Sequence, residues 1–183
     1  MLDFGNGSDQ VTVTITSDVD ISAQTERMTG VWHVEVIDDD KGLIWDETFQ
    51  NLLTTQGKND VLTVYTGGTF STLYASAFTG GSPTLTATYA APVVTEVTSG
   101  TIANRVALSW AAAAAGAIVG TCSIPVLAAT TLTGIMAMHG GAGIATVGNT
   151  TAVGGVLLSE GTLGTPQVIS TTGTLNLSYT LSI

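Results

Sequence analysis

Residues 174–183 read Thr-Leu-Asn-Leu-Ser-Tyr-Thr-Leu-Ser-Ile, and polar and large apolar side chains alternate there without exception. A period of two places every apolar side chain on one face of an extended strand and every hydroxyl or amide on the other. The stretch therefore predicts a β-strand with one buried face. We expect this strand to be a fixed edge of its sheet or the strand that closes it.

The clearest supersecondary unit precedes it, over Val31 to Phe49. Apolar side chains alternate on the first arm, an acidic turn ending in Lys41 and Gly42 follows, and Gly42 suits the left-handed conformation that such a turn needs. On the return arm one phase is shared by Leu43, Trp45, Glu47 and Phe49. We predict a β-hairpin here and an earlier strand over Val11–Thr16, which also alternates.

One helix is expected after the hairpin. Thr54 or Thr55 can cap its start, and apolar residues recur at helical spacing between Gln56 and Thr66. Gly67 and Gly68 then end it. We expect this short helix to pack across a sheet.

From Thr69 onward the sequence predicts short strands separated by Gly, Ser, Thr or Pro. The alanine run 111–115 is interpreted as strand, with small residues where layers approach closely. Val106–Leu127 is uncharged, but its glycines, Pro125 and many alanines favour buried strands over a membrane-spanning helix. Many short strands indicate a mainly β protein, a β-sandwich or jelly-roll-like fold with one short α-helix after the hairpin. The expected strands cover Phe70–Phe78, Leu85–Tyr89, Val93–Val97, Arg105–Trp110, Ala117–Val126, Leu132–Met138, Val153–Leu158 and Val168–Ser170.

The domain organisation follows from the glycine-rich joint at residues 5–8. Residues 1–10 are interpreted as a flexible N-terminal arm, and residues 11–183 as a single β-rich domain. The arm carries Leu2 and Phe4, two apolar side chains that we expect to contact a partner subunit in an assembly. Residues 1–5 lack the basic and apolar regions of a signal peptide.

Charge is scarce and unevenly distributed. Only 10% of the residues are charged, the formal net charge is -10, and 12 of the 14 carboxylates lie within residues 1–60. Nucleic acid is not an expected partner, because no basic patch exists to displace phosphate counterions. The uncharged remainder predicts surfaces covered by other subunits, and hence a homo-oligomer or a larger assembly.

No motif in the sequence indicates catalysis, a cofactor or a metal. Asp38–Asp40 are consecutive, with no acidic residue at the last position of a calcium loop, and predict a solvated turn. His33 and His139 lie outside any metal-binding motif, and Cys122 is the single cysteine. The glycine-rich residues 140–143 lack the lysine of a phosphate loop and predict a mobile loop. Asp46 and Glu47 are adjacent, so they point to opposite faces of a strand.

Two groups of motifs resemble a family of small tailed-bacteriophage virion proteins. One covers the hairpin, from Val34-Glu35-Val36 to Phe49, and continues through Asn51-Leu52-Leu53-Thr54-Thr55 to Gly57-Lys58-Asn59. The other is the closing Gly173-Thr174-Leu175-Asn176-Leu177-Ser178-Tyr179-Thr180-Leu181. Here Thr172-Gly173-Thr174 replaces the acidic residue usual in the family before the last strand, and the middle of the chain is richer in alanine.

The resemblance implies a non-enzymatic structural protein, most like a head decoration (cement) protein. Such a protein lies on the exterior of the capsid, where it binds the major capsid protein and its own copies, with a trimer as one arrangement. The virion that carries it is assembled in the host cytoplasm. A tail or fibre component would share the same composition. A carbohydrate-binding jelly roll is the alternative from another class, and it would need Trp32, Trp45 and Trp110 as exposed stacking platforms.

Overall fold

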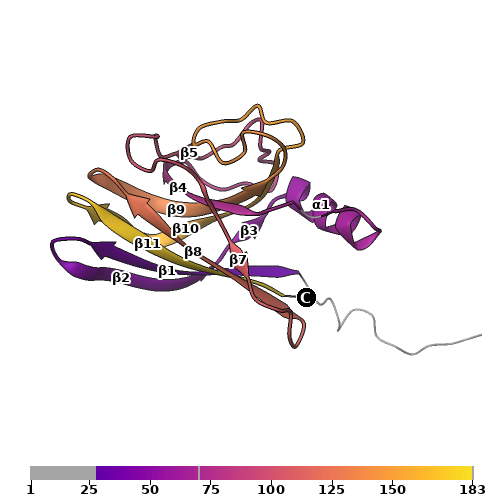
Figure 1. Cartoon of the computed structure of the whole chain (residues 1–183), viewed down its shortest axis with the longest axis horizontal. Helices are drawn as coiled ribbons and strands as arrows, with labels where there is room; N and C mark the ends of the chain where they lie inside the picture. Colours follow the sequence, from indigo (N-terminus) through magenta and orange to yellow (C-terminus); the bar gives the residue numbers. More distant parts are fainter. Residues whose placement is uncertain (1–27, 70, 183) are drawn as a thin grey trace, which may run out of the picture.

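The computed structural model describes residues 28–69 and 71–182. They form two antiparallel sheets packed as a sandwich, with one short helix after the first hairpin, as predicted (Figure 1). The predicted arm, residues 1–10 with Leu2 and Phe4, and the predicted strand Val11–Thr16 lie outside the described residues. The elements are β1 (Thr29–Asp38), β2 (Gly42–Gln50), β3 (Leu52–Leu53), α1 (Thr55–Tyr65), β4 (Tyr74–Gly80), β5 (Thr95–Glu96), β6 (Val106–Ala107), β7 (Ser109–Trp110), β8 (Ala117–Val126), β9 (Thr130–His139), β10 (Val156–Ile169) and β11 (Gly173–Ser182).

Strand β11 lies in the interior of its sheet, whose order is β2-β1-β11-β8-β7. It pairs with β1 on one side and with β8 on the other along its whole length. The expectation of an edge or closing strand was therefore wrong. The alternation was interpreted correctly, because Leu175, Leu177 and Tyr179 are buried while the side chains between them lie on the outer, more exposed face.

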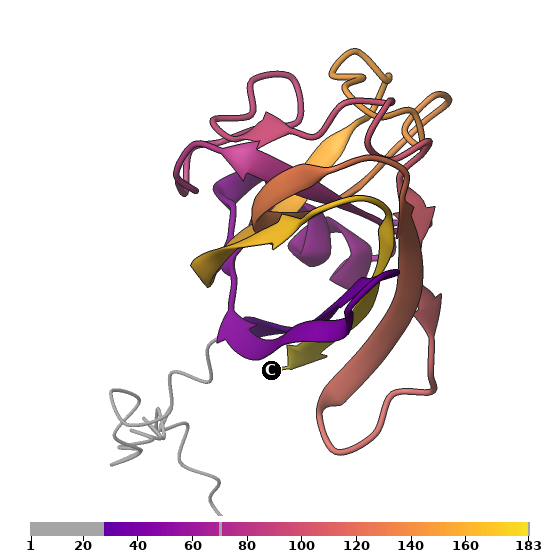
Figure 2. The same ribbon diagram turned by 90° about the vertical axis from the view of Figure 1, so that its left-hand side faces the viewer.

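The second sheet has the order β3-β10-β9-β4-β5, with β6 also paired to β4. Its inner face meets β1 and β11 in the main core, where Trp32 stacks on Tyr179 with ring centroids 4.4 Å apart. Its outer face is covered by the loops that carry Tyr89 and Ile144, which form a second core with Phe78 and Met138 (Figure 2). Because both faces are covered, β9 is buried almost continuously and shows little alternation.

The β1–β2 hairpin forms as expected, with Gly42 in the left-handed region at φ 78°. A bulge changes its end, because Val36 pairs with Trp45 but Ile37 pairs with Leu43. Ile44 consequently packs against the core, whereas Leu43 is 58% exposed and leaves the phase predicted for it. Asp38 also differs from a solvated turn residue, since its carboxylate is buried and accepts hydrogen bonds from the backbone N–H groups of Asp40 and Lys41.

Helix α1 begins after Thr54, as predicted. The Thr54 hydroxyl accepts a hydrogen bond from the N–H of Gly57 at 2.9 Å. The helix packs closely on β10, and a Cβ added to Gly57 would lie 2.4 Å from the carbonyl oxygen of Leu158. Glycine therefore permits the close approach that places the helix beside the sandwich.

Several predicted strands differ from the structure. Leu85–Tyr89 is a loop over the second sheet, with a single isolated bridge between Thr88 and Ala91. The regions Val153–Leu158 and Val168–Ser170 belong mainly to one long strand, β10. Ala111–Gly116 is an exposed turn between β7 and β8, with Ala115 at φ 49°, so the expectation of closely packed strand was wrong.

The uncharged stretch Val106–Leu127 contains strands β6, β7 and β8. A helix with the length and apolar character needed to cross a membrane does not occur among the residues described.

Candidate functional site

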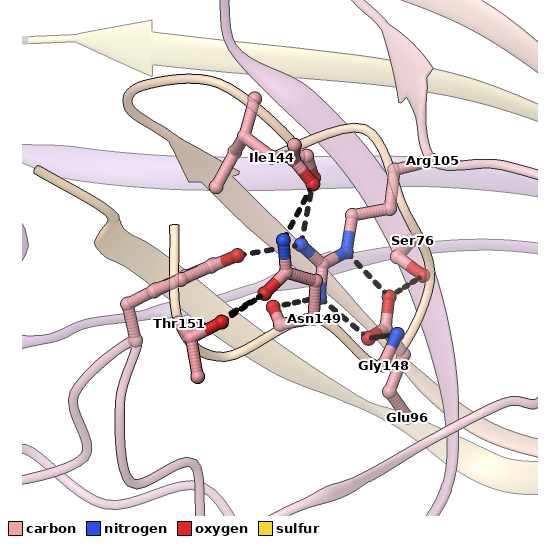
Figure 3. A network of polar contacts seen from close by, with 9 residues as sticks. Ser76, Glu96, Arg105, Ile144, Gly148, Asn149 and Thr151 are labelled. Carbon is pink, nitrogen blue, oxygen red and sulfur yellow. Dashed lines mark hydrogen bonds and ion pairs between the residues drawn. The ribbon is translucent and has the colours of Figure 1, made fainter. Parts of the chain in front are cut away.

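The most extensive polar network in the described residues surrounds Arg105, on the outer face of the second sheet (Figure 3). All five N–H donors of its guanidinium are used. Two bind Glu96 in a bidentate pair, Nε to Oε1 and Nη2 to Oε2, both at 2.7 Å. The others donate to the Tyr89 hydroxyl, the Ile144 carbonyl and the Asn149 carbonyl. The side chains of Arg105 and Glu96 are only 2% and 9% exposed.

Glu96 is equally engaged. Besides Arg105, its carboxylate accepts hydrogen bonds from the Ser76 hydroxyl and from the N–H of Gly148 at 2.7 Å. Burial alone would lower the pKa of Arg105, but the hydrogen bonds and the charge of Glu96 outweigh it and raise that pKa above its ordinary value. The pair is thus a clamp that ties residues 144–149 to the sheet. It leaves no guanidinium donor for a ligand.

The glycine-rich residues 140–143 belong to the loop that this clamp holds. Asn149 adds a further contact, since its side-chain amide donates to the carbonyl of Gly143 at 2.9 Å. The loop was expected to be mobile because of its glycines. Sequence inspection missed the anchor, although Arg105 and Glu96 stand out as isolated charges in an otherwise uncharged region.

The two histidines lie in different surroundings. His33 is on the outer face of the first sheet, half-buried, with its Nδ1 atom 3.1 Å from the Thr48 hydroxyl and 3.4 Å from Asp46. His139 is buried at the end of β9 and its Nε2 atom lies 2.8 Å from the carboxylate of Asp60 on α1. Within residues 28–69 and 71–182, no three His, Cys, Asp or Glu side chains are arranged to hold a metal ion.

A shallow polar depression of about 340 Å³ crosses the outer face of the first sheet. Glu35 accepts a hydrogen bond there from Asn176, which accepts one from Ser123. Cys122 also borders it, and burial raises the pKa of its thiol to about 12. The thiol is therefore a poor nucleophile at neutral pH, and the polar side chains largely satisfy one another.

An apolar groove lies at one end of the sandwich, where α1 meets the ends of β8 and β11. It consists of two adjoining hollows of about 530 and 390 Å³ that share Val61, Ile118 and Leu181. The volumes are those of ordinary ligand pockets, roughly 300–1,000 Å³. The remaining lining residues are Met28, Leu62, Val64, Trp110, Ala113, Gly116, Ala117 and Leu158.

The lining of the apolar groove is also uncharged. Every described residue that lines it is apolar or glycine, and Leu62 on its rim is 61% exposed. Beside it the exposed residues Ala111–Gly116, which we call the alanine tip, project between β7 and β8. The acidic turn Asp38–Lys41 lies at the other end of β1, about 30 Å away for a ten-residue strand (Figure 1).

The sequence predicted Leu2 and Phe4 as partner contacts, and both lie outside the described residues. It did not predict the groove, since Val61, Ile118 and Leu181 are distant in the chain and each belongs to a separate apolar pattern. Leu62, one of the apolar residues at helical spacing that predicted the helix, is exposed. Comparison of the chain with protein-family models, with curated proteins and with solved structures finds no match.

Proposed function

We propose that this protein is a non-enzymatic structural component of a tailed-bacteriophage virion. In this proposal it decorates and stabilises the capsid as a cement protein, through contacts with the major capsid protein and with its own copies. The hairpin and closing-strand motifs that resemble the phage virion family support it. So does the division of the molecule into an apolar end and an acidic end.

The apolar groove carries the proposal. Soluble monomers rarely leave contiguous apolar hollows open to water, and such surfaces usually mark sites of protein association. Each apolar side chain removed from water there contributes about 25 cal/mol for every Å² buried. An uncharged groove bordered by the exposed alanine tip is therefore suited to bind another protein surface.

The acidic turn suits the opposite, hydrated side of a capsid-bound subunit. Asp39, Asp40 and Lys41 are exposed there, and Thr172 donates to Asp39 from the neighbouring turn. A negatively charged outer face would be repelled by packaged DNA and by other acidic subunits. The proposal therefore places this end towards solvent and the apolar end towards the shell.

The tryptophans do not favour the carbohydrate-binding alternative. Trp32 is fully buried, and Trp45 and Trp110 are partly buried against the main core. Trp110 meets Tyr179 edge-on, at 6.3 Å between ring centroids. Trp32 therefore offers no ring face for stacking on a sugar, and packing against the core covers part of the other two rings.

The test is the position of this sandwich in a cryo-electron density map of the intact particle, combined with mass spectrometry of purified virions. The expected result is density for the sandwich on the outside of the capsid shell, with the α1 end against its neighbours. Density on the tail would support the tail or fibre alternative instead. Absence of the protein from purified particles would overturn the proposal.

A further inference from the structure

We infer that the apolar groove binds Leu2 and Phe4 of a neighbouring copy of this chain. The inference rests on the proposed function, because it names the contact through which the copies associate. The groove is preformed between α1, β8 and β11, with Met28 at its rim. Met28 is also the first described residue, so the preceding 27 residues connect directly to the edge of the groove.

The apolar lining of the groove favours a segment that inserts side chains into it over a segment that pairs as a β-strand. Its walls are almost entirely apolar atoms. A segment added as a β-strand would need N–H and C=O partners along its length, because unpaired backbone groups are costly to bury. The groove therefore fits a short segment that inserts apolar side chains and leaves its backbone near the rim.

Two apolar patterns precede Met28. One favours β-strand pairing and the other favours insertion of side chains into the groove. Residues 11, 13, 15, 19 and 21 are Val or Ile and share one phase of a period of two that only Ser17 interrupts, which favours a strand and hence a sheet edge. Leu2 and Phe4 instead form a short pair, separated by Asp3 and followed by the joint Gly5–Ser8. In an extended segment both apolar side chains point to one side and Asp3 points to the other. This pair suits an uncharged groove with an open rim.

The length of the connection favours a neighbour over the same copy. Phe4 and Met28 are separated by 24 peptide steps, a maximum reach of about 80 Å. An extended stretch from Val11 to Ile21 alone spans about 33 Å. A return to the same groove would require the seven peptide steps on either side, about 23 Å each, to run back along that stretch over most of their combined reach. A neighbouring groove within reach imposes no such restriction.

Disulfide trapping tests the contact and its direction. In a Cys122→Ser background, which removes the single cysteine, one tagged full-length chain carries Leu2→Cys and a chain of different mass carries Leu62→Cys. The expected result after mixing and mild oxidation is a mixed dimer that exceeds either homodimer at least fivefold. Leu43→Cys replaces Leu62→Cys as the matched control, because Leu43 is similarly exposed (58% against 61%) but lies in the β1–β2 hairpin.

Equal trapping at positions 62 and 43 would overturn the inference. A chain that carries both Leu2→Cys and Leu62→Cys resolves the direction. Predominant cross-linking within single chains at high dilution would show that each chain binds its own segment, and this also overturns the inference.

Sedimentation equilibrium separates this inference from the proposed function. The double variant Leu2→Ala with Phe4→Ala, and separately Leu62→Glu, should raise the dissociation constant for self-association at least tenfold, whereas Leu43→Glu should leave it within twofold. Leu62 is exposed on a helix, so glutamate is compatible with the fold, and circular dichroism verifies this. Self-association that none of these variants alters would overturn the inference while leaving the proposed function intact. A wild-type chain that stays monomeric at every concentration would overturn both.

Discussion

Three charged residues in the mostly uncharged part of the chain, Glu96, Arg105 and Glu160, have different environments. Glu96 and Arg105 form an ion pair with each other and hydrogen bonds with the surrounding loop. Glu160 on β10 is fully buried, and neither of its carboxyl oxygens has a hydrogen-bond partner of standard geometry. Desolvation raises the pKa of Glu160, and the backbone N–H of Thr84 opposes this only in part. Glu160 is therefore a site where ionisation opposes folding.

The substitution Glu160→Gln should stabilise the protein at neutral pH. The folded state holds the Glu160 proton more tightly than the unfolded state, whose pKa is near 4.5. By linkage, stability is lost as the pH rises from that value to the raised pKa, and the loss persists above it. We expect the variant to be more stable at pH 8 by about 1 kcal/mol or more and to lose less stability between pH 4 and pH 8.

Urea unfolding at a series of pH values measures this effect. Asp40→Asn is the matched control, since Asp40 is exposed in the β1–β2 turn. Identical pH dependence in the wild type and in Glu160→Gln would show that Glu160 ionises as easily in the folded state as in the unfolded one.

At the scale of elements, loops complete the second sheet. Residues 144–149 are tied to β5 and to the segment before β6 by Arg105 and Glu96, while Tyr89 and Ile144 fill the second core beneath them. The ion pair is thus the link between two loops that cover one face of the sandwich. The ion pair joins two segments of the chain, as backbone hydrogen bonds join paired strands, but side chains make this contact.

Arg105→Met should release this loop. The substitution leaves Glu96 buried without its cation, which we expect to destabilise the fold by about 3–5 kcal/mol. Amide hydrogen exchange should increase across residues 144–151, where hydrogen bonds to Arg105 and Glu96 are lost. The double variant Arg105→Met with Glu96→Gln should recover part of the stability, because it removes the uncompensated charge. Unchanged exchange in this loop would contradict the clamp.

At the scale of the whole molecule, the two ends of the sandwich differ in charge. The apolar groove and the alanine tip lie at one end, and the acidic turn lies at the other. With a formal net charge of -10, copies repel one another at long range even where their apolar surfaces fit. Association is then a balance between apolar burial and electrostatic repulsion.

Self-association should therefore become stronger with salt. Raising NaCl from 50 to 500 mM shortens the Debye length from more than about 10 Å to less than about 5 Å and screens the repulsion, while burial of apolar surface is not screened. Sedimentation velocity should show a larger oligomer fraction at the higher salt concentration. Dissociation by salt would instead indicate that ion pairs hold the copies together.

The sequence by itself determined the elements whose signals are local. The alternation in residues 174–183 identifies β11, Gly42 marks the β1–β2 turn, and the Thr54 hydroxyl marks the start of α1. Periodicity and capping depend on neighbours within a few residues, so they can be recognised without the fold.

The tertiary structure alone decided which elements become partners. It placed β11 in the middle of its sheet, used the apolar side chains of Ala87 and Tyr89 to cover a sheet face, and exposed the alanine tip. It also brought Val61, Ile118 and Leu181 together in the apolar groove. A strand pattern shows that one face will be buried but does not specify against what, because that choice depends on contacts between residues far apart in the chain.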